Sequence, residues 1–308
     1  MTVDWSTCPP QNGAARDAWL LAAVEAGEAE YEYAEVPLEV GGRQGFVYIF
    51  RDALKLGGVR INVSADLEQQ IADRLGCVLL TPQLADFLFA ARQWTVTPKT
   101  SNPDNQMAST ARMIAHSDAI DASLVSQGYN GQGIVQTNGK HWALIKTMPA
   151  GKACNYGWHF LGSGQAYAPA TSYTGPGVRV WQPVSTTHNP QHSDYSQVCV
   201  LAARRMVIDG TEYDLGAVMM DAALSGLVAA DGPLSSDRMP GVDSVPAIVP
   251  AIVTPGGGGD VPPAITDGPP PAPPAGEGES TGRKVGKLFL GLAALAALFL
   301  GARAASRG

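Results

Sequence analysis

The last quarter of the chain limits where a folded core can form. From Asp231 the sequence consists largely of Pro, Gly, Ala and small polar residues, as in TPGGGGDVPPAITDGPPPAPPAGEGES. Such a segment cannot bury enough apolar surface to offset the entropy lost on ordering. We therefore expect residues 231–282 to be a disordered Pro/Gly-rich linker. Residues 1–230 would form one globular domain, with two sub-domains meeting near residue 128 as the alternative.

A charge-free apolar run follows the linker. LFLGLAALAALFLGA (residues 288–302) lies between the cations Lys287 and Arg303. A span needs roughly 20 apolar residues, so the flanking cations would have to extend toward the lipid headgroups. The alternative is a hydrophobic helix packed on protein, which the long linker disfavours. We expect residues 283–308 to be a single C-terminal transmembrane anchor whose partner is the lipid bilayer. The side of the membrane stays open between a cytoplasmic and a virion-associated location.

Charge and cysteine usage exclude several classes of protein. The formal net charge is −7 and residues 1–230 contain no cluster of Lys or Arg, so we expect no nucleic-acid partner. The first thirty residues lack the charged and apolar segments of a secretory signal. The four cysteines have no C-x-x-C spacing, which favours buried free thiols over disulfides or a zinc site.

The order of helix and strand signals predicts an α+β fold. In the first half we expect helices over residues 14–30, 64–75, 82–91 and 107–126 and strands over 31–40, 46–50, 59–63 and 77–80. After residue 128 we expect strands over 134–137, 140–146, 153–160, 178–184, 195–208 and 211–213 and a helix over 215–227. The dipeptides Asn138-Gly139 and Asp209-Gly210 are typical of tight β-hairpins. The chain would thus place mixed helices and strands before a mainly antiparallel sheet.

One loop concentrates the polar residues that could carry chemistry. His188, His192, Asp194 and Ser196 lie within nine positions between two predicted strands. In an acid–base site, one histidine takes a proton, Asp194 orients its ring, and Ser196 or a water attacks. In a metal site, the two histidines and Asp194 bind zinc, although no cofactor is required by the sequence. The third alternative is a solvated polar loop without chemistry.

Three residues outside the loop could join such a site. Lys140 and Trp142 face one side of their predicted strand, and His141 faces the other. In residues 153–160, strict alternation puts Tyr156 and Trp158 on one face and Gly157 and His159 on the other. His159 is therefore a candidate, and a hydrogen-bonded sheet histidine is the alternative. His116 lies on an apolar helical stripe, where a core histidine is favoured.

Several short motifs support a resemblance. LLTPQLADFLF, ARMIAHSDAIDASL, GKHWALI, NYGWH and HNPQHSDYSQ follow one another between residues 79 and 197. In this order they resemble an uncharacterised family of phage and bacterial proteins with NYGWH and H-x5-DYSQ motifs. The resemblance covers roughly residues 60–230 and implies no activity. It implies the following candidate site residues: His116, Lys140, Tyr156, His159, His188, Asp194, Tyr195 and Ser196.

These observations lead to two hypotheses from different classes. The first is a membrane-tethered hydrolase acting on a cell-envelope polymer, with peptidoglycan, as glycan or peptide, the leading candidate. His188 and Asp194 would be base and orienting group, and His159 or Lys140 would stabilise negative charge. The second is a non-catalytic, membrane-anchored binding or structural protein, for instance a phage virion component. Nucleotide-binding and common hydrolase motifs do not occur in the sequence.

Overall fold

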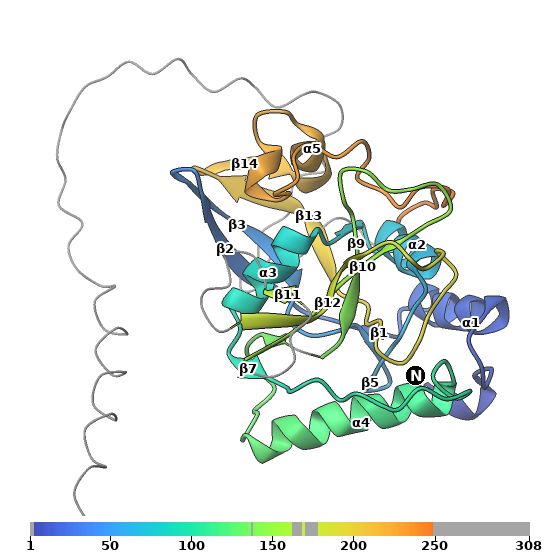
Figure 1. Cartoon of the computed structure of the whole chain (residues 1–308). Helices are drawn as coiled ribbons and strands as arrows, with labels where there is room; N and C mark the ends of the chain where they lie inside the picture. The colour runs from blue at the N-terminus through green and yellow to red at the C-terminus, as the bar shows by residue number, and fades with distance from the viewer. Residues whose placement is uncertain (1–2, 137, 162–167, 170–177, 249–308) are drawn as a thin grey trace, which may run out of the picture. The chain divides into compact units, whose positions relative to one another are not determined.

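The fold is α+β, as predicted: helices and strands are mixed in the first half of the chain, and mainly antiparallel strands follow (Figure 1). The computed structural model describes residues 3–136, 138–161, 168–169 and 178–248. The linker and anchor predicted beyond residue 248 lie outside these residues. In the described part of the chain, no helix has both the length and the apolar character that crossing a membrane requires.

In the described residues, the strands form two larger sheets and two small ones. The five-stranded sheet has the order β14-β13-β3-β2, and β6 also pairs with β13; its strands are β2 Tyr33–Val40, β3 Arg43–Phe50, β6 Cys77–Leu79, β13 Leu201–Ile208 and β14 Thr211–Asp214. The four-stranded sheet has the order β11-β12-β10-β9; its strands are β9 Lys140–Ala143, β10 Cys154–Leu161, β11 Ala168–Pro169 and β12 Val178–Ser185. The small sheets are β1-β4-β5 and the parallel pair β7-β8, formed by β1 Ala29–Glu30, β4 Lys55–Leu56, β5 Val59–Arg60, β7 Trp94–Thr95 and β8 Val135–Gln136. The five-stranded sheet thus combines strands from the beginning and the end of the folded part.

Two of the sheet turns follow directly from the sequence. Gly41 and Gly42 join β2 to β3, with φ values of 60° and 82°. Asp209 and Gly210 join β13 to β14, with φ values of 50° and 82°. Two successive residues with positive φ match the right-handed twist of paired strands, which is why Gly-Gly and Asp-Gly favour this turn.

The helices begin at the caps that the sequence predicts. The Ser64 hydroxyl accepts the amide N–H of Leu67 at 3.2 Å, and the Thr81 hydroxyl accepts that of Leu84 at 3.1 Å. Such bonds satisfy amide groups that have no partner inside the helix. The helices are α1 Ala14–Glu25, α2 Ala65–Arg74, α3 Pro82–Ala90, α4 Thr110–Ser126 and α5 Leu215–Met220, with 3₁₀ turns η1 Trp5–Thr7 and η2 Ser225–Leu227.

A buried arginine attaches helix α4 to the small sheet. The Arg60 guanidinium binds Asp52 at 2.7 Å and Asp121 of α4 at 2.6 Å. The amide N–H of Arg60 also donates to the Ser117 hydroxyl at 3.0 Å. Because Ser117 follows His116, these bonds fix the turn of α4 that carries His116.

The predicted Asn138-Gly139 hairpin is wrong. In the described residues β8 pairs with β7, whereas β9 pairs with β10. The Asn138 side chain donates to Asp52 at 2.9 Å, so it is used in a long-range contact. A Cβ at Gly139 would lie 2.6 Å from the backbone oxygen of Ser196, so glycine here permits close packing of two segments.

Two further boundaries differ from prediction because tertiary contacts override local pattern. The first helix ends at Glu25, and Ala29–Glu30 pairs with β4 instead. The last long strand begins at Leu201 and not at Tyr195, because residues 194–197 turn back on themselves through bonds to the Asp194 carboxylate.

Residues 231–248 pack on the folded part, so the predicted linker start at residue 231 is wrong. Leu234 and Met239 are buried in the main hydrophobic cluster. Arg238 forms an ion pair with Asp73 of α2, and the Ile248 amide donates to the Arg74 carbonyl at 2.9 Å. Composition suggested disorder, but a few well-placed contacts are enough to hold this segment.

The cysteines are buried free thiols, as predicted. Cys8, Cys77, Cys154 and Cys199 are all free and all buried. Burial raises the pKa of the Cys77 and Cys154 thiols to about 12, which makes them poor nucleophiles.

Candidate functional site

The loop between β12 and β13 lies against the beginning of β9 and brings a cation and a carboxylate together. Backbone bonds hold it there: the Lys140 amide donates to the Ser196 carbonyl at 2.6 Å, and the Val198 amide donates to the Lys140 carbonyl at 3.0 Å. As a result, the Lys140 ammonium lies 3.5 Å from Oδ2 of Asp194. Both side chains are 13% exposed, so solvent reaches them only in part.

Asp194 is held as an ionised carboxylate. Oδ1 of Asp194 accepts the Ser196 amide at 2.7 Å and also the Ser196 hydroxyl. Burial acts to raise the pKa of Asp194, but Lys140 and the two Ser196 bonds outweigh it and lower the pKa. Ser196 is buried, and its hydroxyl donates to a carboxylate whose lowered pKa makes it a weak base, so the arrangement does not favour Ser196 as the nucleophile.

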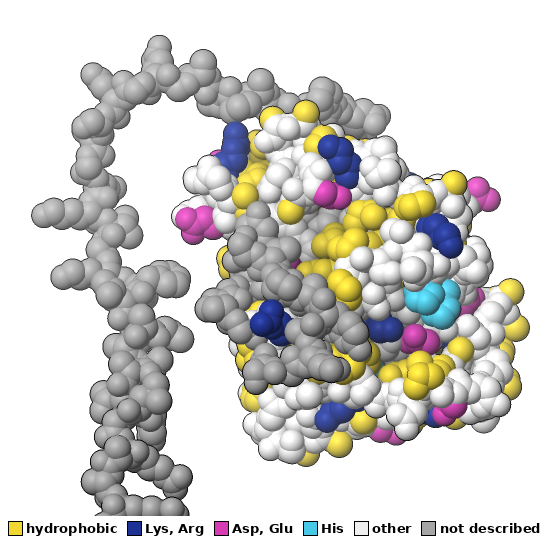
Figure 2. All heavy atoms as spheres, in the orientation of Figure 1, with side chains coloured by type: hydrophobic (Ala, Val, Ile, Leu, Met, Phe, Trp, Pro, Cys, Tyr) yellow, Lys and Arg dark blue, Asp and Glu magenta, His cyan; other side chains and the backbone are white. Residues whose placement is uncertain are grey.

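Two stacked histidines stand beside this carboxylate. The rings of His188 and His192 are 3.9 Å apart and nearly parallel, and Trp142 meets both edge-on at 6.4 Å. Nε2 of His192 lies 3.9 Å from Oδ2 of Asp194. Burial is the main cause that lowers the pKa of both histidines, and for His192 the neighbouring ring lowers it further. Figure 2 shows histidine side chains at the surface next to an acidic and a basic side chain. We call Lys140, His188, His192 and Asp194 the Lys140–Asp194 cluster.

Aromatic rings form the wall behind this cluster. Tyr195 lies between His116 at 5.1 Å and Trp158 at 6.3 Å, and its hydroxyl accepts the Ser101 amide at 2.7 Å. The Lys140 ammonium is 5.8 Å from the centre of the Trp158 ring. His116 is buried, and burial lowers its pKa to about 4. Both Nε2 of His116 and Nε1 of Trp158 are buried without a hydrogen-bond partner.

The opposite face of β9 and β10 holds a second polar group, which is fully paired. Asp86 of α3 accepts the Tyr156 hydroxyl at 2.7 Å and lies 2.7 Å from Nε2 of His159. The Phe89 ring stacks on His159 at 4.9 Å. All these side chains are buried. His141 lies on the same face, and burial followed by the nearby His159 lowers its pKa to about 3. We call Asp86, Tyr156 and His159 the Asp86 triad.

The predicted alternation of β10 fails between these two groups. Tyr156 and His159 are three residues apart, yet both contact Asp86. The backbone turns left-handed at Gly157, with φ 110°, and at Trp158, with φ 57°. The pairing of β10 with β12 shifts register at the same place. A β-bulge of this kind re-aims side chains, which puts Trp158 on the face of Lys140.

The structure thus divides the predicted site residues into two sets. Lys140, His188, Asp194, Tyr195 and Ser196 lie together, with His192 and His116 beside them. His159 and Tyr156 lie on the other face of the strand pair, with Asp86. Within the described parts of the chain, no hydrogen bond, ion pair or ring contact joins His159 to Asp194 or to the stacked histidines.

The zinc alternative does not fit the observed geometry. In the parts of the chain that the structure describes, no group of three or more His, Cys, Asp or Glu side chains is arranged to hold a metal ion. His188 and His192 are stacked, and imidazole lone pairs lie in the ring plane, so their nitrogens do not point at one ion.

Sequence reasoning missed Asp86 altogether. It is the one charged residue in the helix sequence PQLADFLFA, and it is completely buried. A lone carboxylate among apolar helical residues was the available signal, because a buried carboxylate needs partners. Those partners are 70 and 73 positions away in the sequence, so the pattern could not name them.

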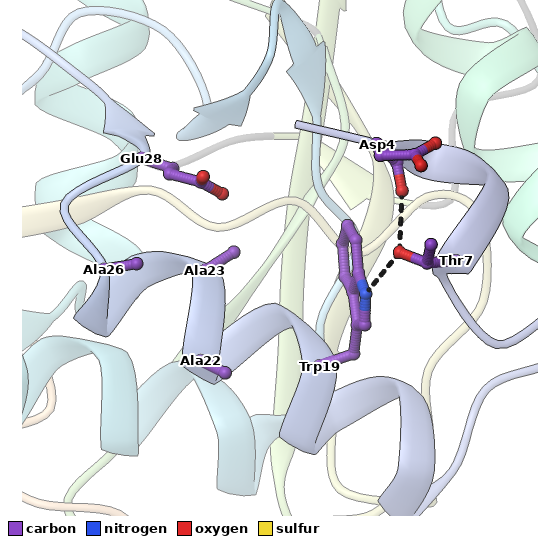
Figure 3. A pocket seen from close by; sticks show the side chains of 7 residues that line it. All are labelled: Asp4, Thr7, Trp19, Ala22, Ala23, Ala26 and Glu28. Atoms are coloured by element: carbon purple, nitrogen blue, oxygen red, sulfur yellow. Dashed lines mark hydrogen bonds between the residues drawn. The ribbon is translucent and has the colours of Figure 1, made fainter. Parts of the chain in front are cut away.

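A separate hollow lies near the N-terminus. It measures about 590 Å³, and Asp4, Trp19 and Glu28 line it together with alanines of α1 (Figure 3). None of the candidate site residues lines this hollow.

Comparison with known proteins adds no further assignment. The chain matches no protein-family model, and searches of curated proteins and of solved structures found no match either.

Proposed function

We propose that the folded part is a hydrolase whose active site is the Lys140–Asp194 cluster. The observation that carries this proposal is the combination of charges in one partly exposed place. The Asp194 carboxylate lies 3.5 Å from the Lys140 ammonium and 3.9 Å from His192, whose ring stacks at 3.9 Å on that of His188, and the pKa of both histidines is lowered. Neutral imidazole is a base at pH 7, and a nearby carboxylate stabilises the imidazolium that forms.

His192 is the proposed general base and Asp194 its partner. His192 takes a proton from a water molecule as the water oxygen attacks the substrate, and the resulting imidazolium gives a proton to the leaving group. The 3.9 Å between Nε2 and Oδ2 is longer than a hydrogen bond, and catalytic bonds often shorten only when substrate binds. Lys140 supplies positive charge for the oxygen that becomes negative.

The charges favour an amide bond within the proposed substrate class. Hydrolysis of an amide builds negative charge on the carbonyl oxygen, which an ammonium stabilises. Cleavage of a glycosidic bond builds positive charge on the sugar and commonly uses two carboxylates, of which this cluster has one. A peptide bond of a cell-envelope polymer such as peptidoglycan is therefore the proposed target. The envelope location rests on the linker and anchor predicted from sequence.

The test is release of soluble fragments from purified peptidoglycan by the full-length protein in detergent. His192→Ala and Asp194→Asn should each lower the rate by about a hundredfold or more. Thr187→Ala, in the same loop but outside the cluster, is the matched control and should keep the rate. Mass spectrometry of the fragments identifies the bond. Equal rates for wild type and both cluster variants contradict the proposal.

One observation favours the non-catalytic alternative. Several groups of the loop are used to hold the loop itself: Asp194 accepts both Ser196 bonds, and the Asp194 amide donates to the Gln197 side chain. A membrane-anchored binding or structural protein would need this rigidity without chemistry. Co-sedimentation with peptidoglycan without fragment release by wild type would support that alternative.

A further inference from the structure

Trp158 reaches the Lys140–Asp194 cluster only because β10 departs from regular strand geometry. In a regular strand, Trp158 would share a face with Tyr156, since alternate residues face the same way. Instead, the left-handed backbone at Gly157 and Trp158 puts the Trp158 ring 5.8 Å from the Lys140 ammonium. The same ring packs 6.1 Å from His116 and 6.3 Å from Tyr195.

This backbone conformation is unfavourable and needs external support. A bulky residue with positive φ costs about 1–3 kcal/mol relative to an ordinary strand conformation. Gly157 lowers the cost at its own position, where a Cβ would lie 3.0 Å from Cδ2 of His141. Trp158 has no such freedom, so surrounding contacts must hold it.

The support comes from the opposite face. Tyr156 and His159 immediately flank the two left-handed residues, and both are bound at 2.7 Å by the same buried Asp86 carboxylate. A single group on α3 therefore holds the strand on each side of the bulge. Phe89, also on α3, stacks on the His159 ring and fixes its plane.

We infer that Asp86, His159 and Trp158 are positioning residues for the Lys140–Asp194 cluster: the Asp86 triad holds the bulge, and the bulge holds the Trp158 ring under Lys140. The inference rests on the proposed function for its consequence in catalysis, but its structural claim can be tested without activity. None of the three residues is assigned contact with substrate.

The predicted consequence is electrostatic. Burial lowers the pKa of His188 most; among charged groups Lys140 and Lys152 lower it and Asp194 raises it, and the stacked His192 ring is the other titratable group beside it. If the Trp158 ring is displaced, the Lys140 ammonium loses this contact and, among the described residues, is held by Asp194 alone, so it can shift relative to the stacked histidines. Because Lys140 lowers the pKa of His188, moving this partly screened cation away by a few ångströms should raise that pKa by about 0.5 unit.

The experiment is an NMR titration of the histidine Cε1 signals in the full-length protein in detergent. His159→Leu removes the bond to Asp86 and should raise the His188 pKa by about 0.5 unit. His159→Gln keeps an N–H donor and should restore the wild-type value. Trp158→Phe replaces the indole with a smaller ring and leaves the Asp86 triad intact. It should also raise the His188 pKa, and it tests the inference if His159→Leu does not fold. Asp73→Asn, at a carboxylate elsewhere in the fold, is the control and should leave the titration unchanged.

The outcomes separate this inference from the proposed function. An unchanged His188 titration in folded His159→Leu and Trp158→Phe overturns the inference, whatever the activity. If the titration shifts as expected but wild type releases no peptidoglycan fragments, the positioning stands and the hydrolase proposal fails. With an active enzyme, His159→Leu should lower kcat at least tenfold with little change in KM, and His159→Gln should recover most of it.

Discussion

The two faces of the β9–β10 strand pair carry similar residue types in opposite states. On one face, Asp86, Tyr156 and His159 are fully buried and bound to one another. On the other, Lys140, Asp194 and His192 are partly exposed and separated by more than a hydrogen bond. The Asp86 carboxylate is completely buried and bonded to two side chains, which is typical of a structural element. The Asp194 carboxylate is also hydrogen-bonded, but its ion-pair partners lie 3.5 and 3.9 Å away and can shift during a reaction. Residue type alone therefore does not identify a working site. The hydrogen-bond partners of the polar groups and their exposure to solvent do.

The largest expected effect is on the paired face. Asp86→Leu leaves the Tyr156 hydroxyl and the His159 ring buried without their carboxylate, which should lower the free energy of unfolding by about 3–5 kcal/mol. Urea denaturation followed by circular dichroism measures it. A loss below about 1 kcal/mol would mean that the two faces do not differ in this way.

The next effect concerns the bulge between the faces. Gly157→Ala places a methyl group 3.0 Å from Cδ2 of His141 and forces alanine to a φ of 110°. We expect a loss of about 2 kcal/mol in the free energy of unfolding. Gly226→Ala, where a Cβ meets nothing within 4 Å and φ is not positive, is the matched control and should be nearly neutral.

A smaller effect is the pH dependence of the free energy of unfolding that arises from two buried histidines, one on each face. His141 and His116 have pKa values lowered to about 3 and about 4, so the unfolded chain binds their protons first as pH falls below 6.5. Each therefore stabilises the fold at neutral pH, and that stability is lost as the pH falls from about 6.5 toward 4 or 3. Between pH 7 and pH 5.5 the loss is about 1 kcal/mol per histidine.

A variant comparison isolates this histidine effect from other groups. Glu68 acts in the opposite direction, because burial raises the pKa of its carboxyl and it favours the fold as pH falls. For His116→Gln and for His141→Gln, we compare the free energy of unfolding of the variant with that of wild type at each pH. This difference should favour the variant by about 1 kcal/mol more at pH 5.5 than at pH 7. A constant difference between variant and wild type at the two pH values contradicts a neutral buried ring.

The smallest expected effect is on the open face. Asp194→Asn keeps the size of the side chain and still accepts hydrogen bonds, so the free energy of unfolding should change by no more than about 1 kcal/mol. Asp194 raises the pKa of His188 and His192, and its neutralisation should lower both values in an NMR titration. A large loss of stability would place this cluster in the same structural class as the Asp86 triad.

Local signals in the sequence were sufficient for much of the fold. The caps Ser64 and Thr81 and the Asp209-Gly210 turn act over three or four residues, and the structure confirms all of them. The Asn138-Gly139 turn failed because Asn138 binds Asp52, 86 residues away. Contacts between residues so far apart in the sequence produce no local pattern that could predict them.

Part of the site was also predictable, because several of its residues lie close together in the sequence. His188, His192, Asp194 and Ser196 are neighbours in sequence, so their grouping could be inferred before their geometry was known. The separation of His159 from them could not, because it depends on two left-handed residues in β10 and on a carboxylate from α3. Strict alternation, the usual guide for a strand, gave the wrong face for Trp158.

The docking of residues 231–248 has a mechanical consequence. Arg238 and the amide of Val245 both bind the Asp73 carboxylate, and the Ile248 amide binds the last turn of α2. Tension applied to the chain beyond Ile248 therefore loads α2 through these polar bonds before it reaches any strand of the five-stranded sheet. The sheet therefore experiences such a pull only after the bonds of Arg238, Val245 and Ile248 to α2 have broken.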